Sequence, residues 1–281
     1  MTAFSLLQDM AIPFSIEFRE PDQHRGFYRI TPQGDKLEEL LCYQNNWFIE
    51  HDLDKLLSLL ISQMMKNKKT WIELVTWKNE DGLIIGISLK TFKPLWSCSG
   101  HHYTYFISIA AETKKPCFFR IPKKRVICCS LQGIEIPNGY FIRLLSKLRK
   151  YDLPKSTDMM LNSKKTHFDF STYRKAHDLG ILKDTKDIGW IGRDYNNPNL
   201  SESYLLFRTG QYKEFRRKLL QYLIHQINRL LCQCADEIGY CGHIEIRCSF
   251  APLSNILDRL ASGEICITQA SEYIWKKKPV I

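Results

Sequence analysis

The sequence lacks the features that would assign it at once to a membrane or secreted class. No run of about 18 apolar residues occurs, so no membrane-spanning helix is expected. No basic leader with an apolar core and a cleavage site opens the chain, since Asp9 and Pro13 interrupt its first apolar stretch. Internal repeats and low-complexity tracts are also missing. We therefore expect a cytoplasmic protein with no membrane partner.

Four motifs of common enzymes are also absent. They are the phosphate loop Gly-x-x-x-x-Gly-Lys-Ser/Thr, the dinucleotide motif Gly-x-Gly-x-x-Gly, His-Glu-x-x-His and Gly-x-Ser-x-Gly. We accordingly expect no cofactor. A metal-dependent nuclease stays an alternative, because carboxylates far apart in sequence can converge on a divalent ion. A structural role is the default for the candidate carboxylates, which are Asp52, Glu73, Asp169, Asp184 and Asp187.

Acidic residues are fewer than basic ones. Thirty Asp and Glu stand against forty Lys and Arg, which gives a formal net charge of +10 and an isoelectric point near 9.0. Such a surplus raises the local concentration of polyanions, so nucleic acid is the expected partner. Simple solubility is the alternative explanation of the surplus.

Basic clusters interleaved with aromatic residues give the candidate contacts. Lysine and arginine would neutralise phosphates, and exposed aromatic rings would stack on bases. Gly189 to Arg193 resembles the Gly-x-x-Gly clamp of some RNA-binding modules, with an ordinary turn as the alternative. The predicted nucleic-acid-binding residues are Lys123, Lys124, Arg125, Arg216, Arg217, Lys218, Trp190 and Arg193. Further stacking candidates are Tyr173, Tyr195 and Trp275.

Ten cysteines in a chain of 281 residues without a leader are expected to be reduced thiols. The strongest metal-like cluster is Cys232, Cys234, Cys241, His243 and Cys248. On a helix, Cys232 and Cys234 would point apart, so we favour buried thiols over zinc and expect no metal. A second group, Cys98, His101 and His102, indicates a turn with exposed imidazoles rather than a nucleophilic pair.

Hydrophobic periodicity predicts an α+β fold, with an N-terminal mixed antiparallel sheet, flanking helices and a mainly helical C-terminal region. The predicted helices lie at 53–65 with Asp52 as N-cap, at 139–150, from Ser201 to about 237, and at 252–260. The segment from Ser201 is either one long helix, which Gly210 can kink, or two consecutive helices. The predicted strands lie within 14–32 and at 70–77, 83–89, 103–110, 117–121, 126–131 and 243–250.

Composition changes twice along the chain. Residues 151–198 are polar and rich in turn-forming residues, which indicates a connector with short helices. We therefore predict an α+β domain at 1–150 and a helical domain at 199–281 that ends in a basic tail.

The order of segments between residues 48 and 131 is shared with a known family. A helix at 51–65 precedes the strand 69–75, a glycine turn and strand at 81–89, an aromatic strand at 103–106 and an Ile-Pro segment within 120–127. This order resembles the wing segment of tailed-phage portal proteins. Lys69 and Thr70 replace the glycine that is usual before the first strand, and nothing matches the portal stem or crown. The resemblance implies a ring-forming, DNA-conducting assembly protein without an active site.

The function expected from the sequence is that of a non-enzymatic, basic binding or assembly protein that contacts nucleic acid, in a phage or mobile element. A homo-oligomer or a larger assembly is a further expectation. The alternatives are a nucleic-acid-processing enzyme and a protein–protein adaptor that docks through its long C-terminal helix. DNA and RNA are not distinguished.

Overall fold

The structure, a computed structural model, describes most of the chain. The described residues are 2–18, 26–31, 36–42, 49–110, 114–152, 170–192, 201–239, 242–247 and 253–275.

Helices and antiparallel sheets together make an α+β fold, which confirms the predicted fold class. The helices are α1 Thr2–Met10, α2 Phe14–Phe18, α3 Lys36–Cys42, α4 Ile49–Lys66, α5 Tyr140–Asp152, α7 Phe170–Asp184, α8 Glu202–Gln233, α9 Ala235–Ile238, α10 Leu253–Ala261 and α11 Ile267–Ile274. The strands are β1 Tyr28–Thr31, β2 Thr70–Lys78, β3 Ile84–Phe92, β4 Trp96–Ser99, β5 Tyr103–Ile109, β6 Pro116–Pro122, β7 Val126–Cys129 and β8 His243–Ile246.

The N-terminal part differs from the prediction. The β element expected at 14–32 is wrong in its first part, where Phe14 and Phe18 lie one helical turn apart in α2 with ring centroids 6.2 Å apart. Helix α4 begins at Ile49, so Asp52 lies inside its first turn and is not the N-cap. A carboxylate there is still favoured by the helix dipole.

Residue contacts divide the chain into two compact units, each assembled from separated segments. The first unit combines Met1–Met10, Tyr140–Lys218 and Ser249–Ile281, and the second combines Ala11–Gly139 and Leu219–Cys248. The predicted division near residues 150 and 198 stays a prediction, because the structure does not describe 153–169 and 193–200.

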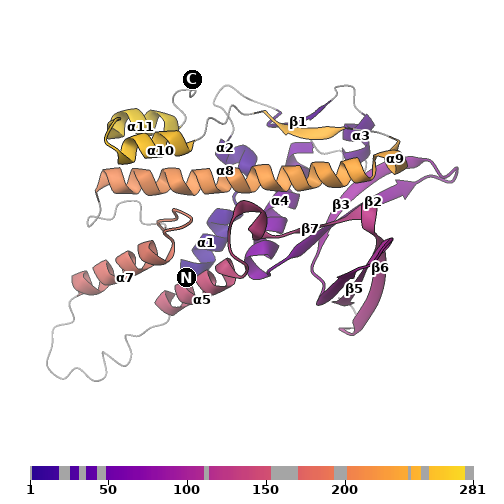
Figure 1. Cartoon of the computed structure of the whole chain (residues 1–281), viewed down its shortest axis with the longest axis horizontal. Helices are drawn as coiled ribbons and strands as arrows, with labels where there is room; N and C mark the ends of the chain where they lie inside the picture. Colours follow the sequence, from indigo (N-terminus) through magenta and orange to yellow (C-terminus); the bar gives the residue numbers. More distant parts are fainter. Residues whose placement is uncertain are drawn as a thin grey trace. The chain divides into compact units, whose positions relative to one another are not determined.

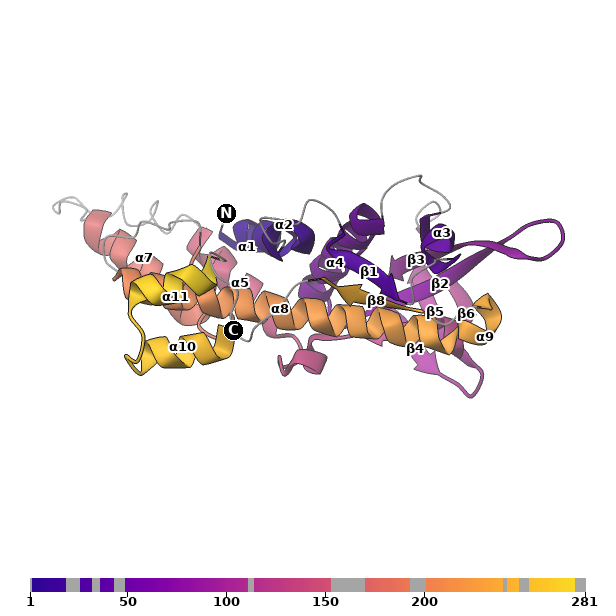
Figure 2. The ribbon, with the colours of Figure 1, turned by 90° about the horizontal axis from the view of Figure 1, so that it is seen from above.

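Two three-stranded antiparallel sheets, in the orders β3–β2–β7 and β4–β5–β6, belong to the second unit. One face of β2 buries Ile72 and Leu74 on the side of Ile87 in β3. The other face carries Trp71, whose ring meets Phe106 of β5 edge-on at 5.0 Å. The sheet β4–β5–β6 therefore packs one of its faces on the sheet β3–β2–β7. The far ends of β2 and β3 extend beyond the rest of the unit as a hairpin (Figures 1 and 2).

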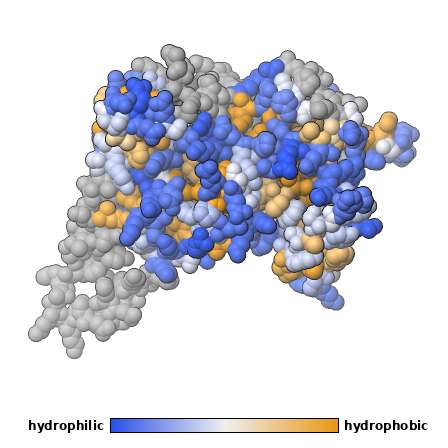
Figure 3. Space-filling model, viewed as in Figure 1, coloured by the Kyte–Doolittle hydropathy of each residue, from blue (hydrophilic) through white to orange (hydrophobic). Residues whose placement is uncertain are grey.

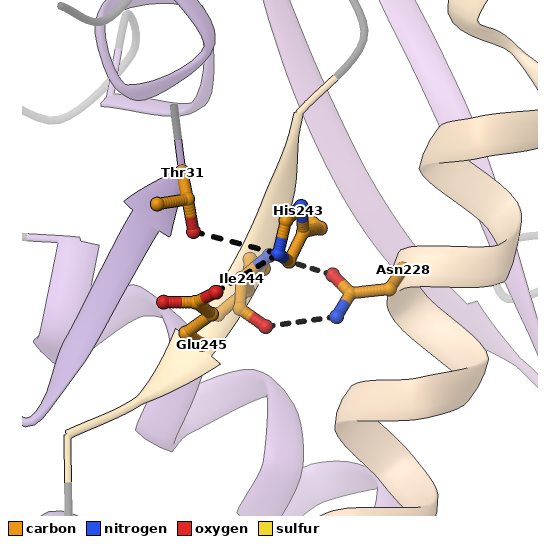
Figure 4. Close-up of polar contacts among 5 residues, drawn as sticks. All are labelled: Thr31, Asn228, His243, Ile244 and Glu245. Atoms are coloured by element: carbon orange, nitrogen blue, oxygen red, sulfur yellow. Dashed lines mark hydrogen bonds and ion pairs between the residues drawn. The ribbon is translucent and has the colours of Figure 1, made fainter. Parts of the chain in front are cut away.

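A third, two-stranded ribbon pairs β1 with β8, although the strands lie more than 200 residues apart in the chain. The side-chain amide of Asn228 in α8 takes the place of a further strand beside β8. Its Oδ1 accepts a hydrogen bond from Ile244 N at 2.7 Å, and its Nδ2 donates to Ile244 O at 2.8 Å (Figure 4). Both backbone groups of a buried residue are thus satisfied by one side chain.

Helix α8 is continuous over 32 residues, about 48 Å at 1.5 Å per residue. Of the two arrangements that the sequence allowed, one long helix or two consecutive ones, the single helix forms. A Cβ at Gly210 would lie 2.6 Å from Leu257 Cδ2, so glycine here serves the close approach of α10. Among the described residues, none of the helices combines the length and hydrophobicity that a bilayer crossing requires.

Candidate nucleic-acid interface

The arginines predicted as contacts in α8 lie in the interior of the first unit. Arg216 is fully buried, and its Nη1 donates to the carbonyl oxygens of Asp9 at 3.0 Å and Met10 at 2.6 Å. Because these carbonyls end α1, the guanidinium serves as a cap for that helix. Arg217 is buried as well and forms a bidentate pair with Glu214. These two predictions are corrected, whereas Lys218 is exposed.

The prediction that Trp190 contacts nucleic acid is corrected as well. The side chain of Trp190 is buried, and its Nε1 donates to Asp9 Oδ2 at 2.9 Å. Its carbonyl oxygen accepts from Thr185 Oγ1 at 2.5 Å and from Arg208 Nη2 at 3.2 Å. The segment is therefore the turn that closes α7, with Gly189 at a φ of +74°. The ordinary turn that we kept as the alternative is what forms at this point, and Arg193 lies outside the described residues.

The metal-like cluster does not assemble within the described residues. Cys234 is buried and donates its S–H to the carbonyl oxygen of Lys124 at 3.1 Å, while Cys232 is exposed. Cys241 and Cys248 lie outside the described residues. In the described part of the chain, no group of three or more His, Cys, Asp or Glu residues is arranged to hold a metal ion.

The candidate nuclease carboxylates are divided between the two units. Asp52 and Glu73 belong to the second, and Asp184 and Asp187 belong to the first, while Asp169 lies outside the described residues. Asp184 accepts hydrogen bonds from Lys147 and Tyr151 of α5, a structural use of the carboxylate.

The two thiols of β7 are half-buried at Cys128 and buried at Cys129. Burial raises the pKa of the Cys129 thiol to about 12, so that it stays protonated near neutral pH. Cys98 is exposed in β4. The rings of His101 and His102, in the turn after β4, are exposed and meet edge-on at 4.4 Å.

A threonine, a histidine and a glutamate meet on the exposed side of the β1–β8 ribbon (Figure 4). His243 Nε2 lies 3.0 Å from Glu245 Oε1 and 3.5 Å from Thr31 Oγ1. The hydrogen bond from His243 is the main cause that lowers the pKa of Glu245. Glu245 and Thr31 both contact Nε2 of His243. In a catalytic triad the histidine instead contacts the nucleophile through one ring nitrogen and the carboxylate through the other. The group is a hydrogen-bonded cluster on the surface of the ribbon.

Exposed aromatic side chains gather on one face of the β4–β5–β6 sheet. Its inner face buries Thr104, Phe106 and Ile121 against the neighbouring sheet. Strand alternation then places the opposite set of side chains on the outer face. This outer set, called the aromatic face below, consists of Trp96, Cys98, Tyr103, Tyr105, Ile107, Ile109, Phe118 and Arg120.

The strand register arranges the aromatic face in rows across the sheet. Trp96, Ile107 and Phe118 share one row, and the next row along the strands holds Cys98, Tyr105 and Arg120. Successive rows are about 6.8 Å apart, since two residues of an antiparallel strand rise by that distance.

Large rings on this face are open to solvent. Trp96 is 50% exposed and Phe118 is 66% exposed. The Tyr105 and Phe118 rings are nearly parallel, 16° apart with centroids separated by 6.0 Å. Hydrophobic surface lies over β5 and β6 at the lower right of Figure 3. A contiguous set of exposed aromatic residues on a sheet marks an interaction surface.

The chain segment that forms the aromatic face is rich in basic residues. Residues 83–134, which include all three of its strands, contain eight lysines and arginines and a single acid, Glu112. Arg120 lies within the face, with its guanidinium 4.7 Å from the centre of the Tyr103 ring. Lys123 follows β6 directly, and its backbone N–H donates to the carbonyl oxygen of His102. Basic and aromatic side chains thus converge at this sheet.

The predicted cluster Lys123–Arg125 forms the single turn η1 between β6 and β7. Lys123 is exposed. Lys124 and Arg125 both pair with Glu237 of α9, with Lys124 Nζ at 3.0 Å from Glu237 Oε2. Of the eight residues that the sequence indicated, these three lie together beside the aromatic face.

Trp96, Tyr105 and Phe118 were not among the residues that the sequence indicated. Both faces of their strands carry apolar side chains, so the sequence does not reveal which face is covered by the neighbouring sheet. The concentration of basic residues between 83 and 134 was the available signal.

No family model and no curated protein matches the chain. The resemblance to a portal wing therefore stays a prediction.

Proposed function

We propose that the protein binds single-stranded nucleic acid on the aromatic face of the β4–β5–β6 sheet. The observation that carries this proposal is the exposure of Trp96 and Phe118 on a sheet whose surrounding segment has eight basic residues and one acid. Unpaired bases would stack on the rings, and Arg120 and Lys123 would neutralise phosphates.

The stacking argument favours single strands over duplexes. Base faces are accessible in an unpaired strand and hidden in a double helix, and each base stacked on an aromatic side chain contributes about 1–3 kcal/mol. Stacking and phosphate contacts carry little base identity, so we expect weak sequence preference and a strong dependence on salt.

Substitution of the exposed rings tests the proposal. Trp96→Ala and Phe118→Ala should each weaken binding of a labelled single-stranded oligonucleotide about tenfold, measured by fluorescence anisotropy with the full chain. Phe4→Ala is the matched control, because Phe4 is 60% exposed but lies in α1 of the first unit and was not among the candidate contacts. Wild-type affinity in both ring variants, or a preference for duplex, would contradict the proposal.

We also propose the wider setting that the sequence suggested. The protein would act without catalysis in a reducing cytoplasm, as a nucleic-acid-binding component of a phage or mobile-element assembly. Among the described residues, seven cysteines are free thiols, which supports the reducing compartment. Mass photometry of the chain with and without DNA tests the ring that a portal-like segment implies: a ring supports that role, and a monomer in both conditions removes it.

A further inference from the structure

One carboxylate holds two of the cations beside the aromatic face. Glu237 comes from α9, more than 100 residues after Lys124 and Arg125, and its side chain is only 14% exposed. The Lys124 side chain is 54% exposed. The backbone at this point is fixed as well, because Cys234 Sγ donates to the carbonyl oxygen of Lys124.

Lys123 and Lys124 lie beside one end of the aromatic face, where a bound nucleic-acid strand would leave it. The turn η1 directly follows β6, whose last residue, Pro122, is paired with Tyr103 at the end of the face. Lys123 is joined to the turn before β5 by its hydrogen bond to His102. A phosphate beside Tyr103 would therefore meet Lys123 first and Lys124 next.

We propose that Glu237 is an internal competitor for the phosphate chain, which lowers the affinity of the aromatic face for nucleic acid. This inference rests on the proposed function. The Glu237 carboxylate and a phosphate would both pair with the Lys124 ammonium, so the charge of Lys124 is already partly neutralised before a phosphate arrives. The competition acts chiefly through Lys124. Arg125 has a second acid nearby, because its charge also lowers the pKa of Glu73 in part. Loss of the Glu237 carboxylate therefore leaves Arg125 with a remaining acidic neighbour.

Neutralising the carboxylate should release Lys124. Glu237→Gln is expected to strengthen binding of a single-stranded oligonucleotide about threefold to tenfold at low salt. One added phosphate contact should steepen the slope of log affinity against log salt by about 0.7. The matched control is Asp236→Asn, which changes the net charge equally at the exposed neighbouring residue of α9. It should leave the affinity within about twofold, because Lys124 and Arg125 pair with Glu237 and the change at Asp236 leaves these two pairs in place.

A double-mutant cycle separates competition from a purely structural role. Lys124→Ala in the wild type should change affinity less than about twofold, since Glu237 already holds this ammonium, whereas Lys123→Ala should weaken binding several-fold. In the Glu237→Gln background, Lys124→Ala should remove the whole gain. Equal affinities of Glu237→Gln and Asp236→Asn, or a large loss from Lys124→Ala alone, would overturn the proposal.

The outcomes distinguish this inference from the proposed function. If Trp96→Ala and Phe118→Ala weaken binding but Glu237→Gln does not strengthen it, the aromatic face stands and the competitor does not. If Glu237→Gln unfolds the chain, which thermal denaturation reports, the comparison of Lys124→Ala with Lys123→Ala decides: equal losses would refute the competitor.

Discussion

Several arginines of this protein are buried and make structural contacts, so they do not add to its positive surface. Arg208 and Arg216 are buried and donate to carbonyl oxygens in the turn after α7 and at the end of α1, and Arg217 is held by Glu214. Three of the cations of α8 therefore stabilise the first unit and are unavailable to a polyanion. A count of lysine and arginine overestimates the binding surface for this reason.

Glu73 gives the clearest pH dependence at the residue scale. Burial raises the pKa of its carboxyl, partly offset by Lys90 and Arg125. The folded state then binds the proton more tightly than the unfolded state, so this residue makes folding less favourable as pH rises above its ordinary pKa of 4.5.

Glu73→Gln should accordingly be more stable than the wild type at pH 7, with an advantage that shrinks toward pH 4. Urea denaturation of both proteins at the two pH values measures the difference in unfolding free energy. Glu80→Gln, at an exposed position of the β2–β3 hairpin, is the control and should show no such trend. An advantage that grows toward pH 4 would contradict this account of Glu73.

At the scale of elements, strong periodicity made several parts of the fold predictable. Helix α4, the β2–β3 hairpin and α8 each carry a long repeating apolar pattern, and each forms close to its expected bounds. Strand β4 has only four residues and was not predicted, and α2 was misread because five residues give no clear period. The pairing of β1 with β8 depends on contacts across the whole sequence, which local patterns do not encode.

Asn228 joins the β1–β8 ribbon to α8. Its substitution tests how much this one side chain contributes to the stability of the protein. Asn228→Ala leaves the N–H and the carbonyl of Ile244 without this partner, although Ile244 is buried. We expect a loss of about 1–3 kcal/mol in unfolding free energy. Arg229→Ala, at the exposed neighbouring position, should change the stability by less than about 0.5 kcal/mol. Similar losses for the two variants would show that the amide contributes nothing specific.

At the scale of the whole molecule, the sequence identified the class of partner we propose but not the surface. The basic turn at 123–125 was found from charge alone, and it lies beside the aromatic face. The rings of that face were missed because only packing of one sheet on the other decides which side of β5 stays exposed. Arg216 and Trp190, which looked equally suitable in sequence, are buried in the other unit.

Photochemical crosslinking with peptide mapping tests the central claim most directly. The full chain would be irradiated with a single-stranded oligonucleotide, and the crosslinked residues would be identified by mass spectrometry. The account predicts crosslinks at Trp96, Tyr105 and Phe118, which decrease as salt is raised. Crosslinks confined to other segments, with none in β4, β5 or β6, would contradict it.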